Sequence, residues 1–161
     1  MRHCFRTLRT LLLLTALSLP LAAQEAPVTL GPKGGFYLEK ANLMLGIVGE
    51  YPLDQRLLLV PGVEYVAGIS ETVRIILDGN VHYLIPIRGS ATRPFLLAGA
   101  GVRFDFFKVG GSSEASFRLN LGAGVAFNTA AAVQPWAGMK FYLLDVKKSD
   151  ICLQGGVNFV L

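Results

Sequence analysis

The stretch TVRIILDGNVHYLIPI, Thr72–Ile87, alternates apolar and polar residues almost without a break. Successive side chains of a β-strand point to opposite faces, so this segment has one apolar face and one polar face. The same alternation recurs along most of the chain, which predicts an all-β fold. Because an apolar outer face around a polar lumen is typical of membrane β-barrels, we predict a transmembrane β-barrel.

Residues 1–23 have the features of a secretory signal peptide. Three arginines precede the apolar core Leu11–Leu21, and Ala22 and Ala23 offer small residues for cleavage after Ala23. The core is shorter than the roughly 20 apolar residues that a spanning helix needs, which argues against a membrane anchor. We therefore expect a signal peptide over residues 1–23 and an outer-membrane β-barrel domain over residues 24–161.

The charge balance gives no support for nucleic-acid binding. The chain has 15 Lys+Arg and 11 Asp+Glu, and loss of the three signal-peptide arginines leaves 12 against 11, a net charge of +1. Cys152 is the only cysteine after residue 23, so no internal disulfide can form. Hydrophobic residues make up 52% of the chain and charged ones only 16%, which is sparse for the outer face of a soluble barrel.

Seven strands are plain in the pattern, and a weaker eighth precedes them. Bacterial outer-membrane barrels have even strand numbers, so we predict an eight-stranded antiparallel up-and-down transmembrane β-barrel. Pro61 lies in the middle of a strand and predicts a bulge, because proline lacks the ladder donor. The predicted strands are Val28–Leu38, Asn42–Tyr51, Arg56–Gly68, Thr72–Ile87, Phe95–Phe107, Ala115–Asn128, Val133–Asp145 and Asp150–Leu161.

Aromatic residues indicate which face is outside. Their odd or even positions along each strand place them on the apolar face. They gather near the two ends of the strands, as in the aromatic girdles of a bilayer-spanning barrel. With the termini in the periplasm, Tyr51, Tyr83, Phe127 and Phe159 fall at the periplasmic end. The opposite end carries Tyr65, Phe104, Phe106, Phe117 and Phe141.

The polar face predicts a lumen filled by paired charges. An eight-stranded barrel is just wide enough for its side chains to fill, so we expect a plugged interior without a conducting pore. Buried charges must pair or form hydrogen bonds to offset their desolvation. The inward cations are Arg56, Arg74, Arg103, Arg118 and Lys140, and the inward anions are Glu50, Glu64, Asp78 and Asp105.

Two near-copies, GAGVRF (Gly99–Phe104) and GAGVAF (Gly122–Phe127), place pairs of glycines on the lumen face. We expect these glycines to make room for bulky inward neighbours such as Trp136 or Tyr142. Neither copy has the third glycine of a phosphate-binding loop or precedes a helical pattern, so we do not predict a nucleotide site.

The chain resembles small bacterial outer-membrane proteins with an outer-membrane β-barrel domain, of the porin-like superfamily of Gram-negative bacteria. The resemblance spans most of residues 35–161 and implies an outer-membrane location, with outer-membrane lipids and the barrel-assembly machinery as partners. One departure is the final Leu161, where the family usually ends in the phenylalanine that this machinery reads. The matching pieces are EYPLDQRLLLVPGVEY (50–65), NVHYLIPI (80–87), RPFLLAGAGV (93–102) and NLGAGVAF (120–127), followed by an apolar closing strand.

The sequence offers little for catalysis. His82 is the only histidine after residue 23, and no nucleophile can be assigned to it. One histidine and the distant Cys152 do not make a metal site. We assign no catalytic, cofactor-binding or metal-binding residue and no cofactor, and we do not predict an enzyme.

Three functions remain open. The first, which we favour, is a structural or interaction barrel in the outer membrane, whose protein or small-molecule ligand the sequence does not name. The second is an outer-membrane lipid-modifying enzyme that uses His82. The third is a periplasmic barrel that binds a lipid in an apolar lumen. The connections 108–114 and 146–150 are short, so no large external recognition surface is evident.

Overall fold

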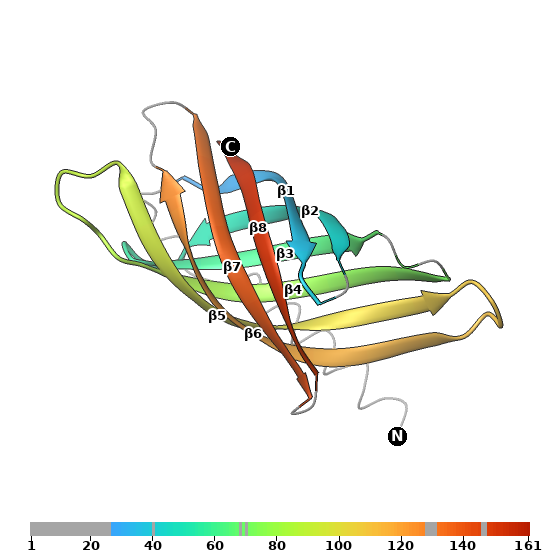
Figure 1. Cartoon of the computed structure of the whole chain (residues 1–161). Helices are drawn as coiled ribbons and strands as arrows, with labels where there is room; N and C mark the ends of the chain where they lie inside the picture. The colour runs from blue at the N-terminus through green and yellow to red at the C-terminus, as the bar shows by residue number, and fades with distance from the viewer. Residues whose placement is uncertain (1–26, 40, 68, 70, 128–131, 146–147) are drawn as a thin grey trace, which may run out of the picture.

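The computed structural model describes residues 27–39, 41–67, 69, 71–127, 132–145 and 148–161. Eight antiparallel strands follow one another in chain order and close into a barrel, with β1 paired to both β2 and β8 (Figure 1). The strands are β1 Thr29–Tyr37, β2 Asn42–Pro52, β3 Leu57–Val66, β4 Thr72–Leu84, β5 Thr92–Phe107, β6 Ser113–Phe127, β7 Val133–Asp145 and β8 Lys148–Val160.

The strands confirm the predicted fold, including the weak first strand. β1 pairs with β8 from Thr29↔Val160 to Tyr37↔Cys152, which closes the barrel. β4 is shorter than the alternation suggested and ends at Leu84, before Pro86. The predicted signal peptide, residues 1–23, lies outside the described residues. Among the described residues, no helix is long and apolar enough to cross a membrane.

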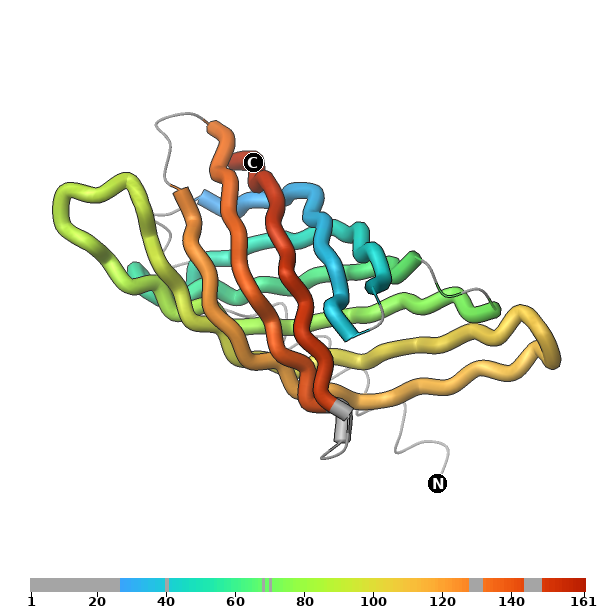
Figure 2. Tube along the Cα trace, in the orientation of Figure 1, coloured from blue at the N-terminus to red at the C-terminus, as the bar shows by residue number. Residues whose placement is uncertain are grey.

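The two ends of the barrel differ in what they carry. Pro27 and Leu161 lie at one end, where the Leu161 backbone N–H donates to the Val28 carbonyl at 3.0 Å; we call this the terminal end. The facing ends of β2 and β3, of β4 and β5, and of β6 and β7 also lie there. The consecutive strands β1 and β2, β3 and β4, β5 and β6, and β7 and β8 meet at the other, distal end, and no more than five residues separate them in the sequence. The β5–β6 hairpin reaches far out at the distal end (Figure 2).

The apolar face of the strands is on the outside, as predicted. Leu119 and Leu121 are 48% and 50% exposed, whereas the neighbouring Arg118 and Asn120 are almost fully buried inside. The aromatic residues assigned to the two ends follow the same rule. Tyr51 and Phe104 are half-buried, and the exposed ones are Tyr65, Tyr83, Phe106, Phe117, Phe127, Phe141 and Phe159.

Inside, two apolar clusters lie on either side of a charged layer. The terminal-end cluster comprises Val48, Val60, Leu84, Phe95, Leu97 and Trp136. The distal cluster comprises Tyr37, Met44, Val66, Ile76, Tyr142 and Cys152. By strand position the charged layer falls between them, since Glu64 lies between Val60 and Val66 on β3. The interior therefore alternates apolar, ionic and apolar layers along its axis.

The predicted bulge at Pro61 is wrong. β2 and β3 keep one register on both sides of it, from Val48↔Gly62 to Tyr51↔Leu59, and β3 and β4 pair continuously through Pro61↔Gly79. The ring is exposed on the outer face. The ladder tolerates the missing donor without shifting, and the register shift between β7 and β8 falls at Leu143/Asp145 instead.

The lumen-facing glycines make room for inward side chains, but for different ones than expected. A Cβ on Gly99 would meet Asn80, and one on Gly101 would meet Asp78. Gly122 and Gly124 do the same for the side chains of Leu97 and Phe95. Trp136 is accommodated by Gly156 of β8, whose added Cβ would lie 2.9 Å from the Trp136 Nε1.

Candidate functional site

A compact ionic network fills the middle of the barrel; we call Lys33, Glu64, Asp78, Arg118, Asn120 and Lys140 the central network. Its side chains come from β1, β3, β4, β6 and β7, and all six are buried. They meet because each is an inward position of its strand at the same height. Three cations therefore face two carboxylates in a space closed to solvent.

Glu64 is the hub of the central network. Its Oε1 accepts hydrogen bonds from Lys33 Nζ at 2.7 Å and from Lys140 Nζ at 2.8 Å. Its Oε2 accepts from Tyr37 Oη at 3.0 Å, from Arg118 at 3.3 Å and from Tyr142 Oη at 3.4 Å. A buried carboxylate needs such dense pairing to offset its desolvation.

Asp78 binds two of the same cations, Arg118 and Lys140. Arg118 Nη2 donates to its two oxygens at 2.9 and 3.0 Å, and Lys140 Nζ donates to Oδ2 at 2.6 Å. Asn120 Nδ2 donates to Asp78 Oδ1 at 3.1 Å and to Asn80 at 2.8 Å. The guanidinium of Arg118 also stacks on the Tyr142 ring, 3.8 Å from its centroid. The Tyr142 ring therefore balances part of the positive charge of Arg118.

A smaller charged group lies towards the distal end. Arg74 Nε is 2.6 Å from Asp105 Oδ1, and Arg103 Nε is 3.1 Å from Asp105 Oδ2. Both arginines are partly buried. The predicted pairing of inward charges is therefore confirmed for Arg74, Arg103, Arg118, Lys140, Glu64, Asp78 and Asp105.

Two sequence predictions about the lumen need correction. The alternation predicts that Arg56 faces inward, but Arg56 lies exposed in the connection before β3, because that strand begins only at Leu57. Lys33 was missed, because the glycines and prolines around it obscure the alternation of β1. The signal that could have found Lys33 is its place as the one charged residue of a strand that must close the barrel.

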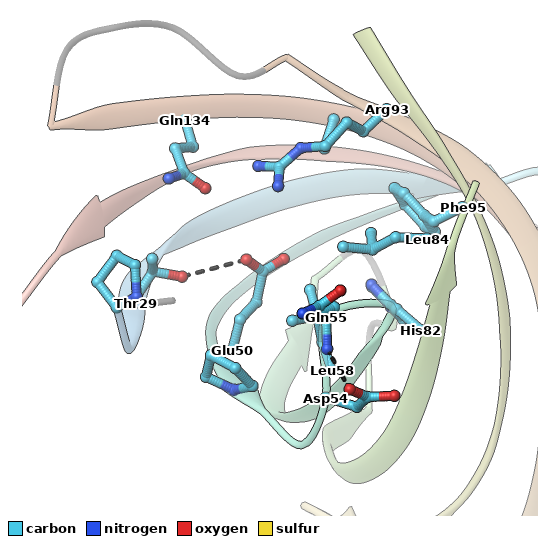
Figure 3. A pocket seen from close by; sticks show the side chains of 13 residues that line it. Thr29, Glu50, Asp54, Gln55, Leu58, His82, Leu84, Arg93, Phe95 and Gln134 are labelled. Carbon is cyan, nitrogen blue, oxygen red and sulfur yellow. Dashed lines mark hydrogen bonds between the residues drawn. The ribbon is translucent and has the colours of Figure 1, made fainter. Parts of the chain in front are cut away.

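A pocket of about 240 Å³ lies at the terminal end of the lumen; we call it the terminal-end pocket (Figure 3). Leu58, Leu84 and Phe95 give it an apolar wall. Its polar side chains come from the ends of several strands and from the β2–β3 connection, and they are Thr29, Glu50, Asp54, Gln55, His82, Arg93 and Gln134. Glu50, predicted to face inward, lies in this pocket and not in the central network.

His82 is buried in this pocket, as its inward parity predicts. Its ring stacks on Phe95 with centroids 4.4 Å apart and an angle of 6° between the planes. No serine or cysteine is among the described residues that line this pocket. Among the described residues, no group of three His, Cys, Asp or Glu side chains could hold a metal ion.

The interior does not fit a barrel that holds a lipid in an apolar lumen. Such a lumen would be lined by apolar side chains with space for an acyl chain. Here the middle of the barrel is occupied by five charged side chains that are each at most 6% exposed, Lys33, Glu64, Asp78, Arg118 and Lys140. The apolar surface is on the outside instead.

Solved structures with the same fold include small outer-membrane barrels. The N-terminal β-barrel domain of OprF from Pseudomonas aeruginosa matches with a TM-score of 0.70 and 16% identity, over 83% of this chain and 96% of that one. Neisserial surface protein A matches with a TM-score of 0.67 and 15% identity, over 83% and 96%. No family model matches the sequence, and no curated protein is significantly similar to it in sequence.

An enzyme is also among the proteins with this fold. The outer membrane enzyme PagL matches with a TM-score of 0.54 and 15% identity, over 83% of this chain and 99% of that one. At these identities the comparisons show the fold, which is the closed eight-stranded barrel of small outer-membrane proteins.

Proposed function

We propose that this protein is an outer-membrane barrel that acts as a structural or interaction protein and does not conduct. The observation that carries the proposal is the inverted polarity of the barrel. Its outside is apolar around its circumference, and its middle is occupied by the buried central network. An apolar band of this kind suits acyl chains, and the two aromatic groups suit the two interfaces of a bilayer.

Outer-membrane lipids are then the partners of the outer face, and the barrel-assembly machinery is the partner that inserts the chain. The similarity to OprF and to Neisserial surface protein A supports this location through fold alone. Recovery of the protein in carbonate-washed outer membranes, with different gel migration before and after boiling, is the expected result. A soluble pool released by osmotic shock would contradict the location.

The central network supports the absence of a pore. Its charged groups are joined by buried ion pairs of 2.6 to 3.3 Å, and opening a path would require separating them, at a cost of several kcal/mol apiece. Reconstituted in planar bilayers, the protein should give no stable ohmic conductance, whereas a wide porin inserted in the same way should. A reproducible single-channel current would overturn this part of the proposal.

We also propose that the chain has no lipid-modifying activity, although the fold alone does not decide this, since PagL shares it. The support is the position of His82, which lies inside the barrel against Phe95 and away from the outer face where lipids would lie. His82→Ala, in a strain that expresses the protein, should leave the modification pattern of outer-membrane lipids unchanged. Loss of one modification with a folded barrel would show the enzyme instead.

A further inference from the structure

The terminal-end pocket contains a cation and an anion that are not paired with each other. Arg93 on β5 has a buried Nε without a hydrogen-bond partner. Glu50 on β2 projects into the same space from another wall (Figure 3). None of the ion pairs between described residues includes either side chain. This contrasts with the central network, where every charged side chain has an ion-pair partner.

Glu50 is held in place by a neutral donor, because Thr29 Oγ1 donates to its Oε2 at 3.2 Å. Arg93 attracts the carboxylate through space but forms no ion pair with it. The carboxylate can therefore still accept a hydrogen bond from a ligand.

The remaining walls suit a small molecule with an apolar middle. The stacked pair of His82 and Phe95 lies beside Leu84, while Gln134 supplies an amide that can donate or accept. The volume of about 240 Å³ corresponds to roughly eight water molecules at about 30 Å³ each. This is the size of an amino acid or a dipeptide and is too small for a lipid.

We propose that the terminal-end pocket binds a small zwitterion of amino-acid to dipeptide size, with its carboxylate on Arg93 and its ammonium group on Glu50. A ligand with only an anion would satisfy Arg93 but face the carboxylates of Glu50 and Asp54. A ligand with only a cation would leave Arg93 unpaired and bring two positive charges together. Only a ligand with both charges pairs both walls, and charge-assisted hydrogen bonds are the strong ones.

This inference goes beyond the proposed function and is independent of it, because binding requires only a folded barrel. With the location proposed above and the terminal end in the periplasm, the pocket opens to the periplasm. Conductance and binding are separate measurements, so failure of one proposal is distinguishable from failure of the other.

The experiment titrates the chain, folded in detergent micelles, with three matched probes and follows backbone amide NMR shifts. Alanyl-alanine carries both charges, N-acetyl-alanyl-alanine only the carboxylate, and alanyl-alanine amide only the ammonium group. We expect alanyl-alanine to bind with shifts at Arg93 and Glu50, and each blocked probe to bind at least about tenfold more weakly. Equal affinities for the three probes, or no saturable shift with alanyl-alanine, would overturn the proposal.

Variants locate the binding to this pocket. Arg93→Gln and Glu50→Gln should each weaken alanyl-alanine binding by about tenfold or more. Arg56→Gln is the matched control, because Arg56 is exposed at the same end but is not among the pocket residues. An equal loss in the control would show that only the general charge of this end matters, against the proposal. The probe comparison uses the unaltered chain and therefore decides the question even if a variant does not fold.

Discussion

The central network and the terminal-end pocket are two polar regions of one lumen, and they differ in whether their charged side chains form ion pairs. In the central network each carboxylate binds at least two cations, and every charged group has a partner within 3.3 Å. In the terminal-end pocket Arg93 and Glu50 are left without an ion pair. Mutual pairing satisfies the charges in the middle of the barrel, whereas the charges of the terminal-end pocket are the ones we propose to pair with a ligand.

Removal of Glu64 should have the largest effect on stability. Glu64→Ala leaves Lys33, Arg118 and Lys140 with Asp78 as their one carboxylate, and a broken buried ion pair costs about 3–5 kcal/mol. Urea titration of the protein in lipid vesicles, followed by the fluorescence of the single tryptophan, Trp136, measures the free energy of unfolding.

The control for this prediction is Glu71→Ala, because Glu71 is exposed at the distal end. This change should stay within about 0.5 kcal/mol of the original chain. If Glu64→Ala lowered the free energy of unfolding no more than its control does, the central network would not be needed for stability. The two regions would then not differ in their contribution to stability.

A methyl group at Gly101 should have the next largest effect. Its Cβ would overlap Asp78 Oδ1 and approach the Leu77 carbonyl oxygen to 2.7 Å, so Asp78 would have to leave its position against Arg118. Overpacking of this kind costs about 1–3 kcal/mol. The same urea titration measures the loss.

Gly79→Ala provides the matched comparison on the adjacent strand β4. Gly79 faces outward, and an added Cβ there would meet no atom within 4 Å. Alanine should therefore leave stability unchanged or raise it by up to about 1 kcal/mol, because it restricts the unfolded chain. Similar losses at both glycines would mean that strand propensity, and not room for Asp78, explains the glycine repeat.

Single hydroxyl groups should have a smaller effect. Tyr142→Phe removes a 3.4 Å hydrogen bond to Glu64 but keeps the ring beneath Arg118, so we expect a loss of about 1 kcal/mol. Tyr37→Phe should cost more, because the Tyr37 hydroxyl donates to Glu64 at 3.0 Å and accepts from Arg118 at 3.4 Å. The reverse order in unfolding titrations would contradict the hydrogen-bond distances.

The sequence predicts the residues of the central network much better than those of the terminal-end pocket, and the reason is physical. The period of two assigns Glu64, Asp78, Arg118 and Lys140 to the lumen, and a closed narrow barrel then forces them together. The inward position of Lys33 is not predicted, because the glycines and the proline of β1 have no strong preference for either face and hide the alternation. The parity of a strand thus predicts which side a residue faces wherever the alternation is unbroken.

The alternation predicts that Glu50 and His82 of the pocket face inward, but it does not fix where strands begin. The predicted strand from Phe95 leaves Arg93 outside, although β5 begins at Thr92, and the predicted strand from Arg56 begins one residue before β3. A shift of one or two residues at a boundary exchanges lumen and solvent for a long side chain. Which side chains converge at the terminal end therefore follows from exact strand lengths, which alternation does not specify.

Replacement of the pocket charges should have the smallest effect on stability, and this result would sharpen the comparison most. Arg93→Gln removes a charge that has no ion-pair partner, so the free energy of unfolding without ligand should change by no more than about 0.5 kcal/mol. The same titration with saturating alanyl-alanine should stabilise the original chain but not the variant, because a ligand bound to the folded state raises its stability by mass action. A large loss without ligand would show that Arg93 supports the fold as Glu64 does, and the terminal-end pocket would then be a second part of the plug.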